Sequence, residues 1–228
     1  MKLLVLSDCH GSAEALDRLD GEFQSADAVL FAGDFADCIK GLPGLPVLER
    51  LCGKHDTVFA VLGNHDAPEF LEELEDRDVN IERTLNFWNG LAFIGSGGST
   101  AFTNDTPNER TEDDILSDYA ILDASADAAP DGTWPQLVVV SHNPPKDTRC
   151  DAVNERLHAG SAQFRRLIEE KKPLAVVAGH IHEGAGIDRI GGTTVVNPGA
   201  LAAGSYAVLE LEERGGVWQV SAAELRRV

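Results

Sequence analysis

Five short clusters of polar residues could bind metal ions, and each directly follows an apolar run. The clusters combine aspartate, asparagine and histidine, which offer carboxylate, amide and imidazole ligands. Because ligands in open α/β sheets bind beyond the carboxyl ends of the strands, we expect the clusters to meet at one crevice. They are Ser7-Asp8-Cys9-His10-Gly11, Gly33-Asp34-Phe35-Ala36-Asp37, Gly63-Asn64-His65-Asp66, Ser141-His142-Asn143 and Gly179-His180-Ile181-His182.

The spacing within two clusters strengthens this interpretation. Asp8 and His10 are two residues apart, as are His180 and His182, and in an extended backbone a period of two places both side chains on one side. This mixed ligand set suits Mn, Fe, Ni, Co or Zn, and without thiolates it is not typical of a closed structural zinc site. A single pattern of this kind is more often a capping turn or a hydrogen-bonded loop, but five together favour a metal site.

The first third of the chain alternates between strand and helix patterns. Such alternation predicts a parallel sheet with helices on its faces. The predicted strands are 2–7, 28–32 and 57–62, and the predicted helices are 12–23, 47–52 and 68–74.

The remaining two thirds predict a second set of strands with helices between them. Together the two sets indicate an α/β fold, a two-sheet β-sandwich flanked by helices, in one domain over residues 1–228. A polar loop is predicted at 95–114, and Gly215-Gly216 predicts a hairpin turn. The strands are 81–84, 86–89, 91–95, 136–141, 174–178, 193–196, 206–211 and 217–222, and the helices are 112–126 and 161–171.

Composition limits the partners and the compartment. The formal net charge of −19 disfavours unaided binding to nucleic acid or anionic membranes, and it fits either an ordinary acidic protein or a salty cytoplasm. The apolar run at 3–6 is too short for a signal peptide or a membrane span, and four cysteines without CxxC spacing fit a reducing compartment. We therefore expect a cytoplasmic protein with no membrane partner. An anionic substrate would need local positive charge, which bound divalent cations would supply.

In this order the five clusters resemble the motif series of the calcineurin-like metallophosphoesterase superfamily. That series reads D-x-H, G-D-x-x-D, G-N-H-D/E, a histidine ending a later strand, and G-H-x-H. The resemblance runs from the first strand to beyond residue 182. It implies a helix-flanked β-sandwich, two divalent metal ions with Mn as the first candidate, and hydrolysis of a phosphate ester.

The resemblance also implies residue roles. One metal would take Asp8, His10 and His182, the other would take Asn64, His142 and His180, and Asp34 would bridge them. A hydroxide bridging the two ions would attack phosphorus. His65 would give a proton to the departing oxygen, and Asp37 would orient its ring.

Departures from the motifs of the best-known family members narrow the range of possible substrates. Cys38 stands where related protein phosphatases carry a phosphate-clamping arginine, which disfavours a protein phosphatase. Ser141 to Thr148 resembles the H-x-P-P-x-x-T stretch of small prokaryotic and archaeal members. Asn143, Lys146 and Arg149 are candidate phosphate contacts, and the alternative is that they are ordinary solvated loop residues.

Three functions remain open from the sequence. The first is a phosphodiesterase or phosphomonoesterase acting on a small phosphate ester. The second is a nuclease or nucleotide hydrolase, although nucleic acid is an unfavourable partner for so acidic a chain. The third is a protein-binding scaffold of the same fold, which the intact motifs argue against. Self-association into a homo-oligomer is left open.

Overall fold

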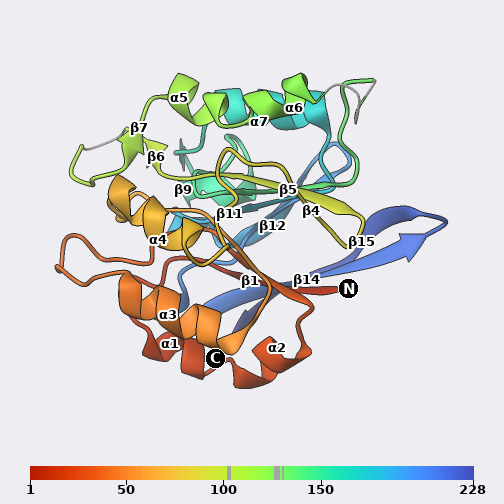
Figure 1. The fold of residues 1–228 in the computed structure, drawn as a ribbon. Coiled ribbons are helices and arrows are strands. Elements are labelled where there is room, and N and C mark those ends of the chain that lie inside the picture. The colour runs from red at the N-terminus through yellow and green to blue at the C-terminus, as the bar shows by residue number, and fades with distance from the viewer. Residues whose placement is uncertain (102–103, 126–128, 130) are drawn as a thin grey trace.

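The computed structural model describes residues 1–101, 104–125, 129 and 131–228. Two large β-sheets lie face to face, with helices on the outer side of each (Figure 1). The predicted α/β sandwich of two sheets flanked by helices is confirmed.

The first sheet has five strands in the order β15-β14-β1-β2-β3. β1, β2 and β3 are parallel, whereas β14 pairs antiparallel with β1 and β15 with β14. Along β1, Leu3 and Val5 face the other sheet while Leu4 and Leu6 face the helices, as the period of two requires. The strands are β1 (Lys2–Leu6), β2 (Ala28–Phe31), β3 (Val58–Ala60), β14 (Ser205–Arg214) and β15 (Val217–Arg227).

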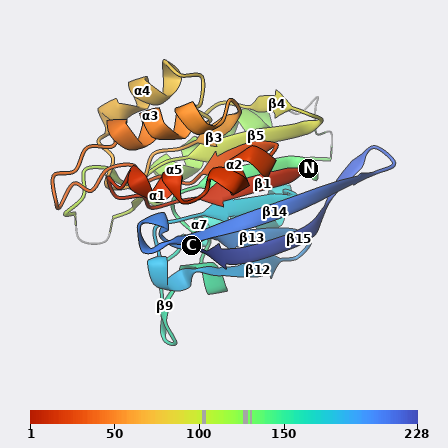
Figure 2. The same cartoon turned by 90° about the horizontal axis from the view of Figure 1, so that it is seen from below.

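Short helices cover the outer face of this sheet (Figure 2). The helix predicted over 12–23 is two helices, because the chain leaves the helical conformation at Leu19 (φ −110°, ψ 17°). Leu16, Leu19 and Phe23 are nevertheless buried, so the spacing identified the packed face correctly and missed the break. The helices are α1 (Glu14–Asp17), α2 (Asp20–Ser25), α3 (Leu45–Lys54), the 3₁₀ turn η1 (Pro68–Phe70) and α4 (Leu71–Glu75).

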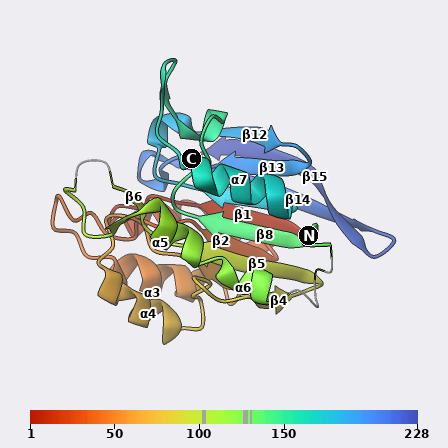
Figure 3. The same ribbon diagram turned by 90° about the horizontal axis from the view of Figure 1, so that it is seen from above.

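The second sheet has six strands in the order β12-β13-β11-β8-β5-β4. Its four central strands are parallel and its two edge strands are antiparallel. Three helices lie over its outer face (Figure 3). The strands are β4 (Asn86–Trp88), β5 (Leu91–Ser96), β8 (Leu137–Ser141), β11 (Ala175–Ala178), β12 (Gly186–Ile190) and β13 (Thr193–Asn197), and the helices are α5 (Glu112–Ser117), α6 (Ala120–Ala124) and α7 (Ala162–Lys171).

Other predicted elements need correction. Segment 81–84 is not a strand, because only Glu82 bridges Gly95 there. The helix predicted over 112–126 is divided into α5 and α6, and Ala126 lies outside the described residues. Strand β12 was not predicted, because its sequence GIDRI mixes polar and apolar residues as an edge strand can.

The loop predicted at 95–114 contains a small parallel pair, and a hairpin follows β8. The pair is formed by β6 (Ser99–Thr100) and β7 (Glu109–Arg110), and the hairpin by β9 (Ala152–Asn154) and β10 (Leu157–His158). Residues 102–103 of the predicted loop lie outside the described part of the chain. Single 3₁₀ turns complete the fold: η3 (Arg149–Asp151), η4 (His182–Gly184) and η5 (Leu201–Ala203).

Helix length bears on membrane insertion. Among the described helices, α3 and α7 are the longest, with 10 residues each. Across residues 1–101, 104–125, 129 and 131–228, no helix is long and apolar enough to cross a membrane.

The space between the sheets is filled by a strongly apolar core. Phe93 of β5 is completely buried there and stacks on Phe59 of β3, with ring centroids 4.2 Å apart. Neighbouring strands add Leu30, Val138 and Val177 to the same cluster. This core holds the two sheets together and so sets the relative positions of their strand ends.

We predict that Phe93→Ala destabilises the protein by ~3–5 kcal/mol, because it leaves a cavity between the sheets. Phe87→Ala is the matched control, since Phe87 on the adjacent strand β4 is 69% exposed. Its effect should stay within about 0.5 kcal/mol. Urea denaturation in the presence of a chelator measures both changes. Equal losses in the two variants would show that the inter-sheet core does not stabilise the fold as argued.

Candidate metal centre

The seven predicted ligands gather where strands of both sheets end. Asp8 and His10 follow β1, Asp34 follows β2, and Asn64 follows β3. From the second sheet, His142 follows β8, and His180 and His182 follow β11. The sandwich therefore brings all five sequence clusters to one edge of the molecule.

One group of ligands is formed by Asp8, His10 and His182. His182 Nε2 lies 3.2 Å from Asp8 Oδ1 and 3.1 Å from His10 Nε2. The ligand atoms of the three residues all lie within 4.8 Å of one another. Two imidazole nitrogens and a carboxylate oxygen at these separations can share one cation.

A second group lies directly beside the first. His142 Nε2 is 2.8 Å from Asn64 Oδ1 and 3.5 Å from Asp34 Oδ2. Asp34 Oδ2 is also 3.8 Å from His10 Nε2, so the Asp34 carboxylate lies between the two groups. The His180 ring lies 5.2 Å from that of His142, centroid to centroid.

The backbone at the ligand positions is unusual. Asp8, His10, Asp34 and His180 have φ values of 57°, 46°, 60° and 67°, in the left-handed region that non-glycine residues rarely adopt. Each such residue costs on the order of 1–2 kcal/mol. Gly33 allows the close approach of two strand ends, because a Cβ there would lie 2.6 Å from Gly63 N. Conformational strain of this kind concentrates at functional sites.

The buried histidines are held as neutral ligands. His142 Nδ1 lies 2.6 Å from the Ala32 carbonyl oxygen, so Nδ1 donates and Nε2 stays available to a cation. Burial lowers the pKa of His142 to about 4 and that of His180 to about 3. Both imidazoles are therefore neutral near pH 7, the form that binds metal.

The carboxylates supply the test of whether a cation fits. Burial, with the charges of Asp8 and Asp66 added, raises the pKa of Asp34 well above its usual range. Burial also acts to raise the pKa of Asp8, but the hydrogen bond to His182 and the nearby histidines outweigh it and lower that pKa. The Asp8 carboxylate stays charged beside these neutral imidazoles, and divalent cations would neutralise it and favour the deprotonated form of Asp34. The residues present thus fit metal ions.

His65 stands next to the ligand groups without belonging to one of the predicted sets. Its ring lies 4.8 Å from that of His10, centroid to centroid, and burial lowers its pKa. The predicted partner Asp37 lies 3.9 Å from His65 Nδ1, beyond hydrogen-bond distance, and is held by Lys40 Nζ at 2.7 Å. Cys38 Sγ is closer to Nδ1, at 3.3 Å. The orienting role of Asp37 remains a prediction.

A loop that sequence reasoning left without a specific role supports Asn64. The Asn64 amide nitrogen donates to Thr106 Oγ1 at 3.1 Å, which leaves Oδ1 facing His142. Thr106 Oγ1 in turn donates to Glu109 Oε1, and Asn108 Nδ2 donates to the Gly63 carbonyl oxygen. The sequence predicted a polar loop at 95–114, but no local pattern identified these contacts.

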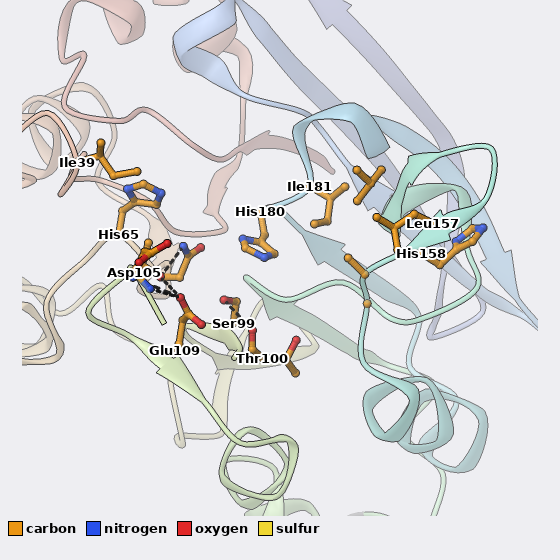
Figure 4. Close-up of a pocket in the computed structure, with 15 residues that line it drawn as sticks. Ile39, His65, Ser99, Thr100, Asp105, Glu109, Leu157, His158, His180 and Ile181 are labelled. Atoms are coloured by element: carbon orange, nitrogen blue, oxygen red, sulfur yellow. Dashed lines mark hydrogen bonds between the residues drawn. The ribbon is translucent and has the colours of Figure 1, made fainter. Parts of the chain in front are cut away.

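A cavity of about 500 Å³ opens beside Asn64, His65 and His180 (Figure 4). The three predicted phosphate contacts are not part of its described lining. Asn143 is buried behind Thr100, whose backbone nitrogen lies 3.4 Å from Asn143 Oδ1, and Arg149 is exposed beside Asp188. Lys146 is half-buried, and its backbone nitrogen donates to Ser161. Their role in substrate binding remains a prediction.

Glu82 fixes the chain just ahead of Asn64. Its carboxylate is 3% exposed and accepts a hydrogen bond from Leu62 N at 2.7 Å. Burial raises the pKa of Glu82 to about 7. Near neutrality this carboxyl group therefore keeps a proton that the unfolded chain would lose.

Histidine and carboxylate side chains that could hold metal ions lie together at strand ends of an α/β sandwich, an arrangement that suits a metal-dependent hydrolase. Comparison with known proteins agrees, since the calcineurin-like phosphoesterase family matches residues 1–184. The chain belongs to this family, as the motif resemblance predicted, and is a metal-dependent phosphoester hydrolase. An uncharacterized protein of Methanocaldococcus jannaschii is 33% identical over 204 residues, covering 87% of this chain and 88% of the relative.

Solved structures of low sequence identity share the fold. A Thermus thermophilus protein superposes with a TM-score of 0.71 at 22% identity, over 99% of this chain and 98% of the other. A dimetal phosphatase from Danio rerio superposes with a TM-score of 0.64 at 14% sequence identity, over 100% of this chain and 98% of the other. An archaeal phosphodiesterase superposes with a TM-score of 0.51 at 14% sequence identity, over 100% of both chains.

We predict that His182→Ala lowers the affinity for Mn²⁺ by at least about tenfold, because the variant loses a ligand of the first group. His158→Ala is a closely matched control: both histidines are partly exposed, at 45% and 34% of the side chain, and both contact a buried aspartate. Calorimetric titration of metal-free protein, with metal analysis by mass spectrometry, measures the change. Equal affinities in the two variants would exclude His182 as a ligand.

We predict a pH-dependent cost of burying Glu82. Its folded pKa of about 7 exceeds its ordinary value of 4.5, so the folded state holds the extra proton between these values. The free energy of unfolding should therefore fall as the pH rises from 4.5 to 7, by up to about 3 kcal/mol. Glu82→Gln should remove this contribution while keeping the acceptor for Leu62 N. If the urea midpoints of wild type and variant differ by the same amount at every pH in that range, the assignment is wrong.

Proposed function

We propose that the protein hydrolyses a small phosphodiester or phosphomonoester at a dinuclear metal centre. The observation that supports this is the position of the Asp34 carboxylate, 3.8 Å from His10 Nε2 and 3.5 Å from His142 Nε2. A carboxylate placed between two ligand groups suits a bridge between two cations.

The two ions would be held by separate ligand sets. Asp8, His10 and His182 would hold one, Asn64, His142 and His180 the other, and Asp34 both. We propose Mn²⁺ as the first ion to test, with Fe, Ni, Co and Zn as alternatives, because imidazole, carboxylate and amide ligands suit all five. The Danio rerio protein that shares this fold is a dimetal phosphatase, which favours two ions over one.

The residues of the chain bind and position the reactants. When bound, the cations supply positive charge that activates a water molecule and neutralises phosphoryl oxygens. The water oxygen bonds to phosphorus, the bond from phosphorus to the departing alcohol oxygen breaks, and that oxygen takes a proton from His65. The water proton passes to solvent.

His65 is placed for this proton transfer. It lines the cavity together with the second-group residues Asn64 and His180. It also lines a neighbouring hollow with the first-group residues His10 and His182. A proton donor placed between the cavity and the hollow can reach the leaving oxygen of a phosphate that both ligand groups hold.

The rival functions receive less support. A nuclease would have to overcome the repulsion between the phosphate backbone and a chain of net charge −19. A protein-binding scaffold would have no need of His65 or of strained ligand positions such as Asp8 and Asp34. Asn143, Lys146 and Arg149 stay proposed phosphate contacts, and a cytoplasmic location stays the expectation from the sequence.

We predict that His65→Gln lowers kcat by about 10²- to 10⁴-fold, because the leaving oxygen loses its proton donor. The bound metal content and KM should change little. The assay compares bis(p-nitrophenyl) phosphate with p-nitrophenyl phosphate in the presence of Mn²⁺, which also separates diester from monoester preference.

His55→Gln is the control for this experiment, since His55 lies away from the ligand groups, where Nε2 donates to the Ala26 carbonyl oxygen and Nδ1 accepts from Thr57 N. It should retain wild-type kcat. An unchanged kcat in His65→Gln at full metal content would remove His65 from the mechanism. Activity on neither ester but on DNA would favour the nuclease.

A further inference from the structure

The cavity beside the candidate metal centre has two chemically different walls (Figure 4). We call Val153, Leu157 and Ile181 the apolar wall. Ser99, Thr100, Asp105 and Glu109 face it across the cavity (Figure 4), and Thr106 also belongs to the lining. Neither wall supplies a proposed metal ligand, so their composition bears on what else the substrate carries.

Two residues of the apolar wall belong to a hairpin that a buried aspartate holds in place. Val153 and Leu157 come from the hairpin β9–β10, which projects from the body of the protein (Figures 2 and 3). The hairpin is anchored by the fully buried Asp151, whose carboxylate accepts hydrogen bonds from Gly160 N and His158 Nδ1. A fixed hairpin holds Leu157 at the cavity although its side chain is 43% exposed.

A second exposed apolar side chain stands at the other end of the cavity. Ile39 is 75% exposed and lies next to His65 (Figure 4). Exposed apolar side chains at both ends of a cavity gain free energy when a ligand removes them from water. These exposed apolar side chains therefore favour the binding of an apolar group in the cavity.

The charge of the cavity is negative away from the metal ligands. The described lining contains Asp105 and Glu109 but no lysine or arginine, and His158 in this lining is paired with the buried carboxylate of Asp151. Glu109 is held in place by the backbone nitrogens of Asn104 and Asp105, which donate to its carboxylate. A second anionic group on the substrate would meet this fixed charge and be repelled.

We propose that the organic arm of the substrate is uncharged and largely apolar, about the size of a phenyl ring or a nucleobase, and that it lies between the apolar wall and Ile39. The inference rests on the proposed function, since it places the phosphate of the same molecule at the metal centre. The volume of about 500 Å³ accommodates such a group. The hydroxyl oxygens of Ser99 and Thr100, whose protons are donated to Thr100 O and Asn143 Oδ1, can accept hydrogen bonds from a polar edge of this group.

Three diesters that share a p-nitrophenolate leaving group test the proposal. Their second arms are methyl, phenyl and 4-carboxyphenyl, and each rate is divided by the rate with aqueous Mn²⁺ to remove intrinsic reactivity. We expect kcat/KM for the phenyl ester to exceed that of the other two by about tenfold or more. Equal values for methyl and phenyl esters would overturn the proposal.

Two variants separate the contributions of the walls. Leu157→Asn should lower kcat/KM for the phenyl ester about tenfold and leave the methyl ester unchanged. Asp105→Asn should raise kcat/KM for the 4-carboxyphenyl ester alone. Leu225→Asn is the matched control, because Leu225 on β15 is 42% exposed and is not part of the described lining. An equal loss on all three esters in Leu157→Asn would contradict a specific contact.

Binding measurements distinguish failure of this inference from failure of the proposed function. Calorimetry with Mn²⁺-loaded protein compares diphenyl phosphate with dimethyl phosphate, neither of which needs to be hydrolysed. Tighter binding of diphenyl phosphate to wild type, weakened in Leu157→Asn, supports the apolar arm even if no ester is cleaved. Equal binding of the two diesters overturns it even if hydrolysis is observed.

Discussion

The mutual repulsion of buried carboxylates is the constraint on which this structure depends. Asp8, Asp34 and Asp66 are all almost completely buried within a few residues of the strand ends. Backbone nitrogens of Phe35, Ala36 and Gly63 donate to Asp66, whereas Asp34 accepts one backbone hydrogen bond, from His65 N, and Asp8 accepts one, from His180 N, and both also face histidine rings. Burying such charges is costly unless positive charge compensates them. Divalent cations would neutralise these buried charges, and relief of the burial cost would increase the affinity for the cations.

The sandwich supplies the rigidity that such a site needs. Asp8 N donates to the Gly33 carbonyl oxygen and His10 N to that of Asp34, so the turns after β1 and β2 brace each other. Residues in left-handed conformations persist only where surrounding contacts hold them. The apolar core between the sheets provides those contacts, because it keeps the ends of β1 and β2 next to those of β8 and β11.

Metal ions would also resolve the conflict between the charge of the protein and that of its substrate. A net charge of −19 repels phosphate esters at long range, and Asp105 and Glu109 add local negative charge to the cavity. Positive charge confined to the ligand groups would attract one phosphate there. The same arrangement would disfavour a second anionic group elsewhere on the substrate, which makes the acidic lining a selectivity device.

The sequence by itself determined the fold class, the family and the identity of the candidate ligands. Apolar runs ending in Asp8, Asp34, Asn64, His142 and His180 are local patterns, and strand periodicity with strand-end chemistry is enough to interpret them. The buried face of residues 12–23 was predicted for the same reason. Breaks such as the one at Leu19 were not, because a helix ends where tertiary packing bends the chain.

Only the tertiary structure decided how distant segments combine. The C-terminal strands β14 and β15 join the N-terminal sheet, and Leu209 pairs with Leu3, a contact that no local pattern encodes. The support of Asn64 by Thr106 and the approach of Cys38, rather than Asp37, to the His65 ring likewise depend on loop conformation. Periodicity reports which face of an element is buried, whereas loop contacts arise from long-range packing that brings side chains together across the fold.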